Sequence, residues 1–155
     1  MWNDETGKRL LKVHDYPATA RQSIIEMHRQ VGDLCFTPDG LAKKGVLLRH
    51  LVMPGKEDEG CQIMDWLGHS VSTDLFVHIM GQYHPDAHVG QPSRVSKSQK
   101  FTAAGASRGE RSSPRRYEDI NRFVKDVELE SVREAAVNAG LWRFHDPVGH
   151  AGYNI

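Results

Sequence analysis

The clearest chemical signal in the sequence is a basic residue inside an apolar segment. Arg49 interrupts residues 46–53, an otherwise mainly apolar run with the length of a β-strand. In a strand, Arg49 shares a face with Leu47 and Leu51. Because burial of a lone guanidinium is costly, we expect an anion to face it, either a bound ligand or an acid elsewhere in the chain.

Polar residues also follow the next apolar segment, residues 75–80, in the sequence Gly-Gln-Tyr-His-Pro. In parallel sheets and barrels, binding sites form where the carboxyl ends of the strands meet. Gln82 and His84 are therefore candidate binding residues, and an ordinary loop is the alternative interpretation. We expect His50 and His78, inside the two strand segments, to pack in the core or against helices.

The nine histidines invite a metal-site interpretation, but their spacing does not favour one. His84 and His88 are four residues apart, and Pro85 disfavours a helix that would carry both. Cys35 and Cys61 are far apart in the sequence and form no CxxC pair. We therefore predict neither a zinc site nor a disulfide framework.

The elements that would hold these residues alternate along the chain. Apolar spacing of three and four predicts a helix that starts at Pro17 and ends at Gly32. Pro38-Asp39-Gly40 predicts a turn. The remaining elements are a strand at 46–53, a helix at 58–67, a strand at 75–80, a helix at 127–139 and a short strand at 141–144. This order predicts an α/β fold with a parallel sheet covered on both faces.

Residues 86–116 break this rhythm, because they are rich in Ser, Gly, Lys and Arg and poor in large apolar residues. We predict that this stretch is a disordered insertion in one domain of residues 1–155. Its basic residues could contact nucleic acid, but it carries the single aromatic residue Phe101. We therefore expect a solvated loop and no nucleic-acid partner.

Bulk properties predict a cytoplasmic protein of ordinary size. The chain has 155 residues and a formal net charge of zero, so no global field draws it to nucleic acid or to a membrane. No apolar stretch approaches the roughly 20 residues that span a bilayer. The first residues have neither the basic start nor the apolar run of a signal peptide.

Several segments, taken together and in order, resemble the C-terminal half of radical SAM proteins, in the branch of pyruvate formate-lyase activating enzyme. They are residues 2–31 with Asp-Tyr-Pro at 15–17, residues 45–55, residues 77–85, Ile-Asn-Arg at 120–122, and residues 135–142. One departure lies in the third segment, where His84 stands in place of the arginine of the usual Gln-Tyr-Arg-Pro.

The resemblance implies a fold, two cofactors and a partner. Members of the family fold as a partial (β/α) barrel, hold a 4Fe–4S cluster on a CxxxCxxC loop, and cleave S-adenosylmethionine to a radical. Activating enzymes use that radical on a glycyl radical enzyme. By resemblance, Arg49, Gln82 and His84 would lie at strand ends that face S-adenosylmethionine.

The chain lacks the residues for the cluster, because it has two cysteines and no CxxxCxxC. We therefore interpret it as the C-terminal half of a partial barrel with parallel strands, a fragment or subunit that is not catalytic alone. Its partner would be the missing N-terminal half or a complementing half-barrel chain. Trp2-Asn3-Asp4 resembles mid-protein sequence, which favours a truncated start.

Two other hypotheses remain open. The half-barrel could serve as a non-catalytic binding or regulatory module that docks on another chain. It could also be a complete small α/β protein with an unrelated role. A half-barrel exposes strand edges and an inner face, so we expect poor solubility or self-association when the chain is expressed alone.

Overall fold

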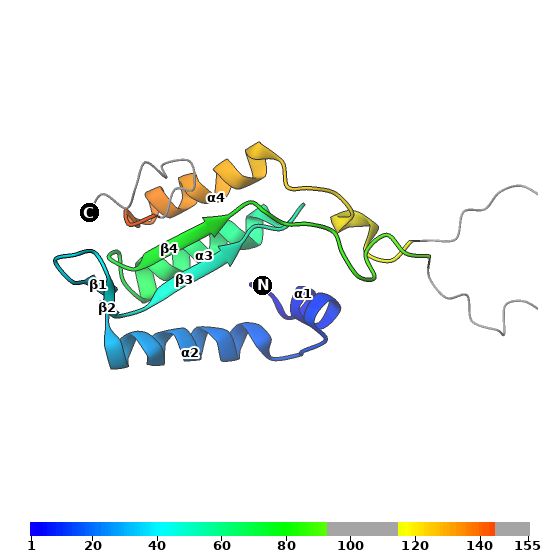
Figure 1. Ribbon diagram of the computed structural model, residues 1–155. Coiled ribbons are helices and arrows are strands. Elements are labelled where there is room, and N and C mark those ends of the chain that lie inside the picture. The colour runs from blue at the N-terminus through cyan, green and yellow to red at the C-terminus, as the bar shows by residue number, and fades with distance from the viewer. Residues whose placement is uncertain (93–114, 145–155) are drawn as a thin grey trace, which may run out of the picture. The chain divides into compact units, whose positions relative to one another are not determined.

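The computed structural model describes residues 1–92 and 115–144. These residues form two compact units, one of residues 1–83 and 124–144 and the other of residues 84–92 and 115–123. The first unit contains the three predicted helices and two of the three predicted strands, in an α/β arrangement (Figure 1). No helix of the described ranges is both long and apolar enough to cross a membrane.

A parallel strand pair forms the centre of the first unit. Strand β3 (Leu47–Leu51) pairs in parallel with β4 (Phe76–Met80), with Leu47 opposite Phe76 and Leu51 opposite Met80. The parallel sheet predicted from the sequence is therefore confirmed for these two strands. The predicted last strand is reduced to one parallel bridge, in which Phe144 pairs with Val77.

Two helices cover one face of this pair. They are α3 (Glu57–Ser70), which connects β3 to β4, and α4 (Asp126–Asn138), which follows the second unit in the sequence (Figure 1). Their apolar stripes meet the inward residues of the strands in one core, whose fully buried members include Met64, Leu67, Leu75, Val77, Val132 and Ala136. Burial of this apolar surface stabilises the layer.

Acidic side chains stabilise the starts of these two helices. Three acids, Glu57, Asp58 and Glu59, occupy the first turn of α3, where they complement the helix dipole. Buried Glu128 accepts a hydrogen bond from the Lys125 amide at 2.8 Å and another from the Gly55 amide at 2.8 Å. It therefore holds the start of α4 against the loop that follows β3.

Helix α2 (Tyr16–Val31) precedes β3 and confirms the helix predicted from Pro17 to Gly32. It ends where Gly32 adopts a φ of 69°, a backbone conformation that glycine adopts without strain. Ahead of it lie α1 (Asp4–Thr6) and the π-helix η1 (Gly7–Leu11). Part of the α2 apolar stripe is exposed, since Met27 retains 48% of its accessible surface.

A small hairpin, which the sequence did not predict as strands, fills the connection from α2 to β3. Strands β1 (Cys35–Phe36) and β2 (Ala42–Lys44) pair antiparallel around the predicted Pro-Asp-Gly turn (Figure 1). The strands were missed because they are only two and three residues long.

The second unit corrects the predicted insertion at both of its ends. The Gly90 amide donates to the Arg116 carbonyl at 2.8 Å, and Pro92 and Arg115 form an antiparallel bridge. The short 3-10 helix η3 (Glu118–Ile120) follows. Residues 90–92 and 115–116 thus pair with each other, while residues 93–114 of the prediction lie outside the described part of the chain.

Candidate functional site

The two faces of the β3–β4 pair have different surroundings. Side chains alternate along a strand, so Leu48, Val77 and Ile79 pack into the core beside the helices. The opposite face carries Leu47 and Leu51, which are 45% and 39% exposed. Within the described residues this face has no covering layer of helices, so the predicted burial on both faces is wrong for one of them.

The open face is continuous across the two strands. Its six side chains come in three neighbouring pairs, which follow from the parallel register: Leu47 and Phe76, Arg49 and His78, Leu51 and Met80. It is therefore an apolar surface with two nitrogen-rich side chains at its centre. Exposure also explains how Arg49 is tolerated here, because its charge remains solvated.

Arg49 and Gln82 converge on the sulfur of Met80. The Arg49 Nη2 lies 3.0 Å from the Met80 Sδ, and the Gln82 Nε2 lies 3.7 Å from the same atom. A thioether is a weak acceptor, so these N–H groups are poorly satisfied by it. Among the described residues no ion pair involves Arg49, so an acid of the chain, one of the two partners that the sequence left open, is absent there.

The third predicted site residue, His84, belongs to the second unit. Its ring packs edge-on against Phe123, with ring centroids 5.4 Å apart, and its Nδ1 lies 3.9 Å from an Asp86 carboxylate oxygen. The structure thus brings Arg49 and Gln82 together and places His84 in a different compact unit.

His78 was predicted to face the core or a helix, and the structure places it on the open face instead. With Arg49 it lines a hollow of about 570 Å³ that the hairpin residues Leu34, Phe36 and Leu41 close on one side. The sequence pattern could not reveal this position, because the parallel register that aligns His78 with Arg49 depends on the fold.

His50 behaves as predicted and packs against a helix. Its Nε2 lies close to Gly60 of α3, where an added Cβ would approach it to 3.1 Å. Burial lowers the pKa of His50 to about 4, so its imidazole is neutral near pH 7. The residue therefore belongs to the packed face and has no charge to offer a ligand at that pH.

Asp33 connects three elements in an arrangement that resembles a catalytic triad in composition only. Its two carboxylate oxygens lie 3.0 Å from the His28 Nε2 and 3.1 Å from the Ser72 Oγ, which donates to it. In a nucleophilic triad the histidine lies between the acid and the serine. Here the acid lies in the middle, so His28 cannot take a proton from Ser72, and the group acts as a structural clamp.

Buried Glu59 anchors the N-terminal segment to α3. It accepts hydrogen bonds from the Thr6 hydroxyl at 2.5 Å and from the Trp2 amide at 2.7 Å. Burial alone would raise the pKa of Glu59, but these hydrogen bonds outweigh it and lower the pKa. No local pattern in the sequence could reveal this contact, because it joins residues more than fifty positions apart.

The cysteines do not fit a 4Fe–4S cluster. Cys35 is exposed on the hairpin, whereas Cys61 lies on α3 with its Sγ 3.5 Å from the Ser131 carbonyl oxygen. Burial raises the pKa of Cys61, which disfavours the thiolate that a metal requires. In residues 1–92 and 115–144 no three His, Cys, Asp or Glu side chains gather as a metal-binding group.

Comparisons of the chain with protein-family models, with curated proteins and with solved structures find no match. They therefore do not show a family. The functional interpretation depends on the open face, on its two converging donors and on the topology that presents them.

Proposed function

We propose that this chain is the C-terminal half of a partial (β/α) barrel of the radical SAM type, similar to pyruvate formate-lyase activating enzyme. The observation that carries the proposal is the parallel β3–α3–β4 layer, which is covered by helices on one face and open on the other. The inner face of a barrel is covered only when the barrel is complete. A reducing, cytoplasmic setting fits the two free cysteines.

In the completed barrel, Arg49 and Gln82 would bind S-adenosylmethionine. The Arg49 guanidinium suits its carboxylate, and the Gln82 amide suits a ribose hydroxyl. Both side chains now contact only the weak acceptor of Met80 among the hydrogen-bond partners that the structure describes for them. Exchange of a thioether for a carboxylate would strengthen these hydrogen bonds.

The 4Fe–4S cluster would have to be held by the other half of the barrel. Because the cysteines of this chain do not fit a 4Fe–4S cluster, the chain alone would not cleave S-adenosylmethionine. Activation of a glycyl radical enzyme would then belong to the completed assembly. Anaerobic reconstitution of the isolated chain with iron and sulfide is expected to leave no stable 4Fe–4S signal, and a stable signal would overturn this part of the proposal.

The binding role is tested on the native assembly, purified anaerobically, by equilibrium dialysis with S-adenosylmethionine. Arg49→Ala should weaken binding about tenfold or more, since it removes a charge-assisted contact. Arg29→Ala is the matched control, because Arg29 lies on the exposed surface of α2 and bonds Glu26 at 2.8 Å. Equal affinity of the Arg49 variant and the control would contradict the proposed site.

A second candidate is a non-catalytic module that docks on another chain through the same open face. The exposed apolar side chains Leu47 and Leu51 favour it, because contiguous apolar surface marks interaction sites. The two candidates differ in one result. A docking module would keep its partner when Arg49 is changed to Ala and would show no S-adenosylmethionine binding in either form.

A further inference from the structure

In the part of the chain that the structure describes, helix α2 lacks the partner strand that the topology of this layer calls for. Parallel neighbours need a crossover connection, which is usually a helix. Helix α3 makes that connection from β3 to β4, and α4 leads into the bridge that Phe144 forms beside β4. Helix α2 leads into β3 in the same way, yet no described strand precedes α2.

As far as the described ranges 1–92 and 115–144 go, the edge of β3 away from β4 is free over the length of the strand. Within the described residues β3 has one strand neighbour, β4, and no further backbone hydrogen bond of Leu47–Leu51 crosses to another segment. The Val52 amide donates to the Met80 carbonyl at 2.9 Å. By alternation, the amides of Leu47, Arg49 and Leu51 therefore point away from β4.

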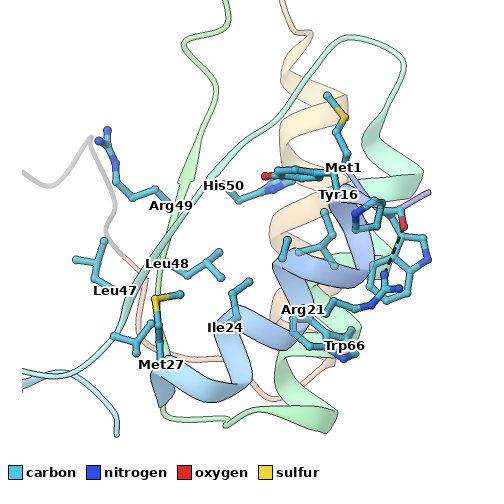
Figure 2. Close-up of a pocket in the computed structure, with 15 residues that line it drawn as sticks. Met1, Tyr16, Arg21, Ile24, Met27, Leu47, Leu48, Arg49, His50 and Trp66 are labelled. Carbon is cyan, nitrogen blue, oxygen red and sulfur yellow. Dashed lines mark hydrogen bonds between the residues drawn. The ribbon is translucent and has the colours of Figure 1, made fainter. Parts of the chain in front are cut away.

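A pocket follows this free edge. The cavity has a volume of about 260 Å³, and one of its walls consists of five successive residues, from Val46 just before β3 to His50 within it. Residues of both strand faces can line one pocket together only along the strand's edge. The opposite wall is the stripe of Ala20, Ile24 and Met27 on α2, and Figure 2 shows Leu48 and Ile24 pointing toward each other across the cavity.

The two ends of the pocket differ, and the difference indicates the direction in which an added strand would run beside β3. At the start of β3, the Val46 amide donates to the Gly32 carbonyl at 3.0 Å and Asp33 bridges Val46 in parallel, so the chain that leaves α2 enters β3 at this end. At the other end, Met1 lines a neighbouring pocket with Leu51 and Met53. A strand parallel to β3 would finish beside Met1, from which the chain returns through α2 to the start of β3.

We infer that the free edge of β3 is the docking site for one further parallel β-strand, supplied by the polypeptide that joins this chain ahead of Met1. Its backbone would bond the outward amides of Leu47, Arg49 and Leu51, and its apolar side chains would enter the cavity against α2. This inference rests on the proposed function, since the same missing half would supply the strand.

Two other occupants fit the edge less well. A second copy related by a twofold axis would pair antiparallel, and pairing centred on the middle residue of β3 would place two Arg49 side chains opposite each other. A small molecule fits poorly because the cavity, about 260 Å³, is below the roughly 300–1,000 Å³ of ligand pockets.

The test adds a probe strand to the full chain. A strand of about six alternating valine and threonine residues is fused ahead of Met1 through a glycine–serine linker. Amide hydrogen exchange is then measured residue by residue by NMR. The matched control carries the same extension with proline at its centre, which cannot complete a strand pairing.

The expected result is protection at alternate residues. The amides of Leu47, Arg49 and Leu51 should exchange about tenfold or more slowly in the strand fusion than in the proline control. The amides of Leu48, His50 and Val52 point toward β4, so they should change little. Leu51→Pro in the fusion should abolish the added protection at Leu47 and Arg49 while leaving β4 protected, because its amide is not used by β4.

Three results would overturn the inference. Equal exchange of the outward amides in the fusion and the control would show that the edge does not accept a strand. Uniform protection of both sets of amides would indicate general stabilisation. The same alternate protection in the unextended chain, together with a dimeric mass, would assign the edge to a second copy. None of these readouts involves S-adenosylmethionine, so the proposed function can fail while the docking edge stands.

Discussion

At the scale of single residues, the polar groups of this chain divide by the face on which they lie. Arg49 and Gln82 converge from the open side on one sulfur atom, whereas His50, next to Arg49 in sequence, is held neutral in the packed side. The alternation of side chains along β3 is the physical reason for this division. The open side therefore carries groups that can bind a ligand, and the packed side carries a buried histidine that makes the stability of the fold depend on pH.

His50 predicts an acid-sensitive fold. Its pKa in the fold is about 4, below the ordinary 6.5, so the unfolded chain binds the proton more readily. The contribution of neutral His50 to the free energy of unfolding is complete above about pH 6.5. It falls by roughly 1.4 kcal/mol per pH unit as the pH is lowered from there toward 4. Urea unfolding of His50→Gln should show a weaker loss between pH 7 and about pH 5 than the native sequence.

The control for this prediction is His69→Gln, since His69 lies exposed on the same helix layer with its Nδ1 near Asp65. If the native chain and His50→Gln lose stability in parallel as the pH falls, His50 does not titrate as its burial requires.

At the scale of elements, close backbone approach holds α3 to the end of α4. A Cβ added at Gly68 would lie 2.2 Å from the carbonyl oxygen of Ala139, which is backbone and cannot move aside easily. Gly68→Ala should therefore lower the free energy of unfolding by about 1–3 kcal/mol, despite its better helix propensity. Gln62→Ala, on the exposed side of α3, should change it little. Equal free energies of unfolding for the two variants would contradict the close approach of Gly68 to Ala139.

The Asp33 clamp should contribute to stability and not to chemistry. Asp33→Ala removes the partner of both His28 and Ser72, so we expect a loss of about 1–2 kcal/mol in urea unfolding. Asp39→Ala, in the exposed hairpin turn, is the matched control. A loss no larger than that of the control would show that the clamp is not formed in solution.

Some of these elements could be predicted from the sequence and others could not, for physical reasons. Helix α2 and the pair β3–β4 were predictable because Pro17, Gly32 and the apolar runs are local signals. The hairpin strands are too short for periodicity to show. The pairing of residues 90–92 with 115–116 and the placement of His78 beside Arg49 depend on contacts between distant segments. Arg49 and Gln82 were found from strand position, but their convergence on Met80 required the fold.

At the scale of the whole molecule, exposed apolar surface should make the isolated chain associate. Leu47 and Leu51 on the open face are 45% and 39% exposed, and contiguous apolar surface promotes association between chains. Leu47→Lys should shift sedimentation velocity profiles toward the monomer. Val137→Lys is the control, because Val137 is 61% exposed on α4 and not on the open face of the strands. A native chain that sediments as a monomer and unfolds cooperatively would contradict the prediction.

We propose that another half completes this chain, and the endogenous protein can be used to test this proposal. Peptide mapping of the native product, with its intact mass, would identify what adjoins Met1 and what purifies with it in fixed ratio. We expect peptides from a CxxxCxxC segment, either in the same polypeptide or in such a partner. A native product that starts at Met1 and is stable without any partner would contradict it.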